Sequence, residues 1–285
     1  MNRVGPVVFV IPAVFAPLVL KRRVWRTQSC IKSLHEKMKR MIVLFTDFGV
    51  NGPYVGQMKA VLMQHAPEAA VIDLFADVPA WNIKAAAYLL PAYVEEFPRG
   101  TIFLCVIDPG VGTQTRRPVI LNIDGRWFVG PDNGLFNMVA LRAHNRGDIQ
   151  WWDITWQPDR LSNSFHGRDL FAPVAAMLAR GDMPATQQQS ATQRIDTTWP
   201  EQLSAIIYID CFGNAMTGMQ ARALTKENVV IVHQHRLVYA RTFAEVPAGE
   251  SFWYENANGL VELATNQGRA CDMLSLEIGV SIAIE

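Results

Sequence analysis

The chain has 285 residues, of which 50% are hydrophobic and 18% are charged, a composition typical of a folded globular protein with a sizeable core. Its 26 Lys and Arg side chains balance 26 Asp and Glu side chains, and a net charge of zero argues against nucleic acid as a partner. The four cysteines lie far apart, which predicts reduced thiols in a cytoplasmic protein and no disulfide framework.

Residues 1–40 differ from the rest of the chain. Val4–Leu20 carries no charge, but it is short for a membrane span and is interrupted by three prolines. We therefore expect an N-terminal extension outside a fold that begins at Met41, and consider a membrane anchor to be the alternative.

From Met41 to residue 183, apolar strands alternate with helices, which predicts an α/β domain whose mostly parallel sheet carries helices on both faces. Asn82 is expected to cap a helix that Pro91 kinks, and Asp124-Gly125 predicts a tight hairpin. The expected strands are 41–45, 70–75, 101–107, 118–123, 126–129 and 149–155, and the expected helices are 54–64, 83–97, 135–143 and 170–180.

Residues 184–200 are rich in Gln, Ser and Thr with little periodicity, which predicts a linker. Beyond it no long helix interrupts the strand patterns, so residues 201–285 are expected to form a small all-β barrel domain. The expected strands are 203–209, 229–233, 237–242, 251–254, 260–263 and 274–278.

Polar residues follow the apolar strands of the first domain. Asp108 follows the buried run Thr101–Ile107, Asp47 follows the strand from Met41, and Asp132 follows the hairpin. In open α/β sheets, ligands bind at the carboxyl ends of the strands, so these carboxylates are candidate site residues. His166 lies in a glycine-containing loop before a helix and is the candidate imidazole.

Three interpretations of these residues remain open at this point. Each Asp alone is also typical of a residue that caps its own turn. Asp47, Asp108, Asp132 and His166 together could be metal ligands of a nucleotide hydrolase. A nucleoside-binding module without catalysis is the third hypothesis.

Five motifs occur in the order Thr46–Gly49, Asp108–Gly112, Pro131–Gly134, Phe165–Asp169 and Asp210–Asn214. Together they resemble the S-adenosyl-L-methionine hydroxide adenosyltransferases, relatives of the fluorinase and chlorinase. The resemblance covers the chain from Met41 to the C-terminus. It implies an α/β domain, a β-barrel domain, and a homotrimer whose sites lie between subunits.

The resemblance also implies a reaction, in which water displaces methionine from C5′ of S-adenosylmethionine without a metal or other cofactor. The catalytic set of the family corresponds to Asp108, Arg116 and His166, with Arg117 as the alternative arginine. Halogenases of the family have a tyrosine at the position of Asp108 and a halide-binding serine at that of Gly167, so this chain resembles the water-using branch.

Substrate contacts are implied in the same way. Asp47 resembles the ligand of the ribose diol, and Trp81 an aromatic wall near the sugar. Asp210 resembles a contact to the methionine amino group, and Phe212 and Asn214 resemble adenine contacts. The serine-arginine pair that the family places after an asparagine is replaced here by Ala257-Asn258.

The residue types suit this chemistry, because the sulfonium is already a good leaving group and only the water needs activation. Our hypothesis is that Asp108 and His166 both accept hydrogen bonds from that water and help to remove its proton, while Arg116 holds the carboxylate.

Overall fold

The computed structural model of the chain describes residues 40–113, 116–144 and 148–285. The prediction of an extension or anchor therefore concerns, up to residue 39, a segment outside the described residues. Within the described ranges, no helix is both long enough and apolar enough to cross a membrane.

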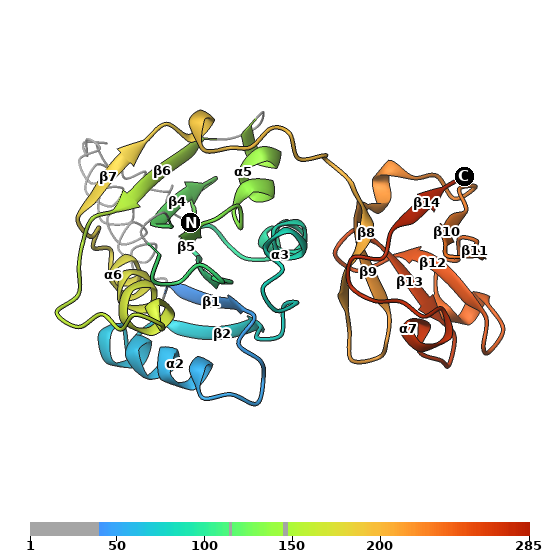
Figure 1. Cartoon of the computed structure of the whole chain (residues 1–285), viewed down its shortest axis with the longest axis horizontal. Helices are drawn as coiled ribbons and strands as arrows, with labels where there is room; N and C mark the ends of the chain where they lie inside the picture. Colours follow the sequence, from blue (N-terminus) through green and yellow to red (C-terminus); the bar gives the residue numbers. More distant parts are fainter. Residues whose placement is uncertain (1–39, 114–115, 145–147) are drawn as a thin grey trace, which may run out of the picture. The chain divides into compact units, whose positions relative to one another are not determined.

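The first part of the fold is built on a seven-stranded sheet with the order β2-β1-β3-β5-β4-β6-β7 (Figure 1). Strands β4 and β7 run opposite to the other five, which makes the sheet mostly parallel, as predicted. The strands are β1 (Met41–Thr46), β2 (Ala70–Phe75), β3 (Ile102–Val106), β4 (Arg117–Ile123), β5 (Arg126–Asp132), β6 (Ile149–Ile154) and β7 (Thr186–Gln189).

Strands β1 and β3 form the centre of this sheet and place the candidate carboxylates. Both strands are apolar over most of their length and almost completely buried. They pair in parallel, with Thr46 opposite Val106. The loops that follow the two strands, which begin with Asp47 and with Ile107-Asp108, therefore leave the sheet at the same edge.

The helices of this part pack against the sheet in two groups. Ile42 and Leu44 of β1 belong to a buried cluster with residues of α2 and α6, whereas Val43 and Phe45 belong to a cluster with residues of α3, α4 and α5. This division follows from the alternation of side chains along a strand. The helices are α2 (Tyr54–His65), α3 (Ile83–Leu89), α4 (Pro91–Val94), α5 (Asn137–His144), the π-helical turn η1 (Gly167–Phe171) and α6 (Ala172–Arg180).

Local sequence signals correctly predicted the positions of one helix cap, one helix break and one turn. The Asn82 side chain accepts a hydrogen bond from the Ala85 N–H at 3.0 Å, and Pro91 separates α3 from α4, so both predictions are confirmed. The hairpin turn is confirmed too, since Asp124 and Gly125 have φ values of 50° and 77°, the left-handed pair that a tight two-residue turn requires.

The second part of the fold is an antiparallel β domain of two sheets, β12-β13-β9-β8 and β11-β10-β14 (Figure 1). Isolated bridges join Ala205 to Ser281 and Tyr239 to Trp253, so each sheet contacts the other at both of its edges. The strands are β8 (Leu203–Ile209), β9 (Ala215–Gln220), β10 (Val230–Val232), β11 (His235–Leu237), β12 (Ser251–Glu255), β13 (Leu260–Thr265) and β14 (Ile282–Ile284). Helix α7 (Ala270–Met273) and the 3₁₀ turns η2 (Ala191–Gln193), η3 (Ala221–Ala223) and η4 (Phe243–Glu245) complete the described elements.

Two sequence predictions differ from the structure. The expected strand at 274–278 is wrong: these residues form a turn after α7, in which Leu274 and Leu276 are buried and Ser275 has a positive φ of 53°. The predicted linker contains β7, which pairs with β6 at the edge of the large sheet. The strand Thr-Gln-Gln-Gln has no apolar alternation to reveal it, because an edge strand holds its place through backbone hydrogen bonds.

Candidate active site

The edge of the sheet where β1 and β3 end borders a cavity of about 470 Å³. Asp47, Asp108, His166 and Trp81 all line it, so four of the predicted site residues meet around one space. The other lining residues are Phe48, Tyr54, Val106, Pro109, Val111, Ser164, Phe165 and Gly167.

Arg116 joins the candidate acid to the candidate imidazole. Its Nη2 lies 2.8 Å from Oδ2 of Asp108 and 2.6 Å from Nδ1 of His166. The Asp108 and Arg116 side chains are each only 5% exposed, and the guanidinium also lies over the ring of Phe171. Asp108 and Arg116, from the loop between β3 and β4, and His166, from the loop before η1, thus form one chain of contacts.

The geometry distinguishes the two candidate arginines. Arg116 precedes β4, whereas Arg117 is its first residue and is directed elsewhere. The Arg117 side chain is 58% exposed and lies 3.7 Å from Asp153. Arg116 is therefore the arginine that contacts both Asp108 and His166.

The contact with Arg116 defines the protonation state of His166. A guanidinium has only donors, so Nδ1 of His166 has to accept, and the neutral ring carries its proton on Nε2. Burial lowers the pKa of His166, and the positive charge of Arg116 lowers it further. Asp169 and a backbone hydrogen bond with Ser162 act against this lowering, but burial is the largest effect and favours the neutral imidazole.

The pKa of Asp108 is shifted in the opposite direction, upward. Burial raises the pKa of its carboxyl, and the charge and hydrogen bond of Arg116 act against that rise. A backbone hydrogen bond from Gly110 also acts against the rise, and both carboxylate oxygens are buried. A buried carboxylate has room for more hydrogen bonds than these two partners supply, and a water molecule in the cavity would provide one.

The loop that carries His166 is held from outside the cavity. Asp169 lies in η1, accepts the Ser162 N–H at 2.9 Å and forms an ion pair with Arg168. Arg168 also donates to Gln57 of α2 at 2.8 Å. A π-helical turn in place of a regular helix start is a common feature of functional sites.

Asp47 and Trp81 line the same cavity and are joined by a hydrogen bond. The backbone N–H of Trp81 donates to Oδ2 of Asp47 at 2.9 Å, and burial raises the pKa of this carboxyl. Trp81 has a positive φ of 59° and its side chain is 77% exposed. A left-handed conformation at a bulky residue is strained, and such strain is concentrated at ligand sites.

Three aromatic rings in this cavity were not predicted as site residues. Phe48, Tyr54 and Phe165 pack against one another with ring centroids 5.4–5.8 Å apart. Phe48 and Phe165 each lie next to a candidate polar residue in their motifs, which is the signal that could have identified them. They give the cavity an apolar wall.

The predicted residues of the β domain border a different cavity, of about 530 Å³. Phe212 and Asn214 line it, and the Phe212 side chain is 71% exposed. Asp210 does not line this cavity. Its carboxylate accepts hydrogen bonds from the backbone N–H groups of Phe212 and Asn214 and from the Asn214 side-chain amide. The two cavities share no lining residue within one chain.

Asp132 does not join the other carboxylates. It pairs with Arg194 and lines a third cavity, which contains neither Asp47 nor Asp108. Among residues 40–285, leaving aside the undescribed 114–115 and 145–147, no group of three or more His, Cys, Asp and Glu side chains could hold a metal ion. The ligand set proposed for a metal-dependent hydrolase is therefore not assembled in the described part of the chain.

A buried carboxylate, an arginine and a neutral imidazole beside an aromatic cavity define a site suited to activating a small nucleophile. Comparison with known proteins agrees with this class. Models of the SAM hydroxide adenosyltransferase N-terminal and C-terminal domains match residues 42–188 and 204–283. The chain belongs to the SAM hydroxide adenosyltransferase family, which confirms the predicted resemblance.

Individual relatives are similar over most of their length. A protein from Thermus thermophilus named (R)-S-adenosyl-L-methionine hydrolase is 35% identical over 264 residues, which cover 86% of this chain and 99% of the relative. One of the same name from Salinispora arenicola is 35% identical, with coverage of 84% and 95%. A fluorinase from Nocardia brasiliensis is more distant, at 23% identity with coverage of 87% and 97%.

A solved structure gives the same result for the fold. The crystal structure of an uncharacterized conserved protein from Thermotoga maritima superimposes with a TM-score of 0.75 at 29% identity, covering 86% of this chain and 100% of that one.

Proposed function

We propose that this protein hydrolyses S-adenosyl-L-methionine to adenosine and L-methionine, and that it acts on the (R)-sulfonium epimer named in its relatives. The observation that carries the proposal is the chain of contacts Asp108–Arg116–His166 beside the cavity. It offers a buried carboxylate and an imidazole to a water molecule.

The reaction balances without an added reagent. A water oxygen forms a bond to C5′ while the C5′–S bond breaks, and its electron pair stays on sulfur to give the neutral thioether of methionine. One proton leaves the water, passes to Asp108 and is released to solvent. Alignment of the water with the C5′–S bond can supply about 7–11 kcal/mol, and a general base typically adds about 10²–10⁴-fold in rate.

The protonation state of His166 revises its expected role. With Nδ1 occupied by Arg116, Nε2 carries the hydrogen and cannot accept one from water. We assign proton removal to Asp108 alone, whose raised pKa makes it a better base than an exposed carboxylate. His166 donates its Nε2–H to the water oxygen and thereby fixes the position of the oxygen lone pair that attacks carbon.

Substrate contacts are proposed from the two cavities. Asp47, beside Trp81, would accept hydrogen bonds from the ribose hydroxyls. The exposed ring of Phe212 would stack on adenine, and Asn214 would pair with its edge. Asp210, which already holds its own loop, would give its remaining lone pairs to the methionine ammonium.

Because one chain keeps these groups in two cavities, we propose a homotrimer in which the first cavity of one subunit faces the second cavity of another. We also propose that the β domain closes as a barrel, supported by the two bridges between its sheets, and that helices cover both faces of the large sheet. The scheme requires no metal or other cofactor, and the expected location is the cytoplasm.

The direct test is to incubate the purified full-length protein with S-adenosylmethionine and to quantify adenosine and L-methionine, with and without EDTA. We expect both products in equal amounts, insensitive to the chelator. Loss of activity with EDTA, restored by a divalent cation, would favour the metal-dependent hydrolase. Tight adenosine binding with no product after prolonged incubation would favour the non-catalytic module.

A further inference from the structure

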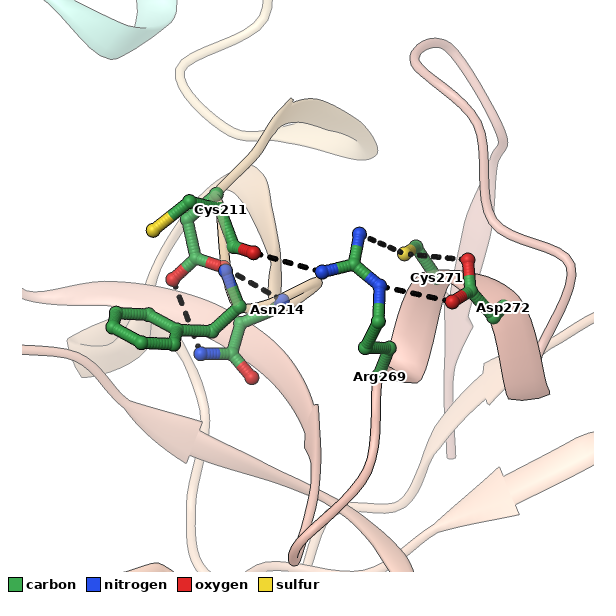
Figure 2. A network of polar contacts seen from close by, with 7 residues as sticks. Cys211, Asn214, Arg269, Cys271 and Asp272 are labelled. Atoms are coloured by element: carbon green, nitrogen blue, oxygen red, sulfur yellow. Dashed lines mark hydrogen bonds and ion pairs between the residues drawn. The ribbon is translucent and has the colours of Figure 1, made fainter.

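The loop Asp210–Asn214 carries an exposed aromatic ring, but its backbone is fixed by hydrogen bonds within the loop and by one from outside it. Inside the loop, the Asp210 carbonyl accepts the Gly213 N–H, and the Asp210 N–H donates to the Asn214 carbonyl. On the outside, Arg269 lies at the end of the turn between β13 and α7, and its guanidinium reaches back to this loop (Figure 2).

Arg269 makes three contacts through one planar group. Nη1 donates to the Cys211 carbonyl at 2.7 Å, Nε donates to Asp272 at 2.9 Å, and Nη2 lies 3.5 Å from Sγ of Cys271. Figure 2 shows the guanidinium between Cys211 and Asp272, with the Cys211 side chain directed away from it. A fork of fixed donors suits three acceptors in different directions, which a lysine ammonium on a flexible chain does not match.

The Cys211–Phe212 peptide is therefore held at both of its polar atoms. Arg269 binds its carbonyl oxygen, and the Asp210 carboxylate accepts its N–H at 2.9 Å. A peptide unit is planar, so fixing both atoms fixes its orientation and with it the direction in which the Phe212 side chain leaves the backbone. The ring itself stays 71% exposed beside the cavity.

Gly213 shows how closely the loop approaches Arg269. It has a positive φ of 84°, and a Cβ at this position would lie 2.8 Å from Cβ of Arg269 and 3.0 Å from Sγ of Cys271. Its carbonyl accepts the Cys271 N–H at 2.9 Å. The glycine thus allows the contact that brings the arginine within reach of the Cys211 carbonyl.

We propose that Arg269 is a positioning residue for the nucleoside part of the substrate: it orients Phe212 for stacking on a flat heteroaromatic base. This inference rests on the proposed function, which supplies the base. The Arg269–Asp272 ion pair is solvent-exposed, with side chains 49% and 67% accessible, and exposed pairs of this kind contribute little to stability. Loss of Arg269 is therefore expected to affect binding and to leave the fold intact.

The test compares Arg269→Met with Arg236→Met, a matched control whose arginine forms an exposed ion pair with Glu285 elsewhere in the β domain. For Arg269→Met we expect KM for S-adenosylmethionine and the Kd for adenosine to rise about five- to tenfold, the lower end of the loss of a base–aromatic stack, with kcat within about twofold. Arg269→Lys, which can still reach the carbonyl, is expected to restore part of the affinity. The midpoint of thermal unfolding should shift no more than in the control.

A double-mutant cycle tests whether Arg269 acts through Phe212. If it does, Arg269→Met/Phe212→Ala binds adenosine no more weakly than Phe212→Ala alone, because the ring that Arg269 orients is already absent. Additive losses, an unchanged Kd in Arg269→Met, or a fall in kcat at constant KM would each overturn the proposal, as would a wild type that does not bind adenosine. Wild type that binds adenosine but forms none from S-adenosylmethionine contradicts hydrolysis, while the Kd comparison still decides the role of Arg269.

Discussion

The two cavities of this protein hold their polar groups in different ways. In the α/β part, the Asp108 and Arg116 side chains are buried in one loop, and Arg116 also contacts His166 from another loop. In the β domain, the Asp210 carboxylate accepts hydrogen bonds from the backbone of its own loop, and the Phe212 side chain in that loop is exposed. Burial changes the pKa of the first group, which suits proton transfer, whereas a fixed loop with an exposed ring suits binding. The first cavity should therefore govern kcat and the second KM.

Asp108→Asn should produce the largest effect. We expect kcat to fall by about 10²–10⁴-fold, the usual contribution of a general base, with KM within about threefold. Steady-state kinetics will measure both constants, and Asp182→Asn, at an exposed ion pair with Arg180, is the control. Equal losses of turnover and of binding would show that the carboxylate holds substrate and not water.

Arg116→Met separates the two neighbouring arginines. It removes the partner of a buried carboxylate, which typically costs about 3–5 kcal/mol, and it releases His166, so both kcat and the free energy of unfolding should fall. Arg117→Met, at a side chain 58% exposed, should change stability by less than about 0.5 kcal/mol and leave kcat nearly unchanged. Denaturant unfolding and kinetics of the pair check this, and similar behaviour of the two variants would contradict the assigned geometry.

The pH dependence distinguishes the roles of Asp108 and His166. The pKa of Asp108 is raised and Asp108 acts as the anion, so kcat should rise with pH through a value above the ordinary one for aspartate. His166 has a lowered pKa and acts when neutral, so its protonation adds to the loss only in acid, below its ordinary pKa.

Two variants of His166 test which group acts as the base: His166→Gln keeps an N–H donor, and His166→Ala does not. The acidic limb of the pH–kcat profile should persist in His166→Gln, with more activity than in His166→Ala. If the acidic limb disappeared in His166→Gln, the imidazole and not Asp108 would be the base.

Phe212→Ala should give the smallest effect and only on binding. Loss of one base–aromatic stack is worth about 1–3 kcal/mol, so KM should rise at least about fivefold while kcat stays within about twofold. Val238→Ala, at another exposed apolar residue of the β domain, is the control. A fall in kcat at constant KM would place Phe212 with the chemistry and remove the contrast between the two cavities.

Some features of the fold and the site could be predicted from the sequence because they depend on strand patterns or on a few neighbouring residues. Asp47 and Asp108 were identifiable because apolar strands that pair in parallel deliver their following loops to one edge of a sheet. The turn at Asp124-Gly125 and the cap at Asn82 depend on a few neighbouring residues, so local patterns sufficed.

Other features depend on contacts that a local pattern does not contain. The choice between Arg116 and Arg117 follows from where β4 begins, and the tautomer of His166 follows from a contact 50 positions away along the chain. Strand β7 is polar, and the apolar residues at 274–278 belong to a buried turn, so hydrophobic periodicity did not predict either one.

The most direct measurement is hydrolysis of S-adenosylmethionine in ¹⁸O-labelled water, followed by mass analysis of the adenosine. Attack of an oriented water on C5′ predicts one ¹⁸O atom per adenosine, at the 5′ oxygen, and unlabelled methionine. Adenosine without the label, or a labelled product in which the bond between C5′ and sulfur is intact, would contradict the account.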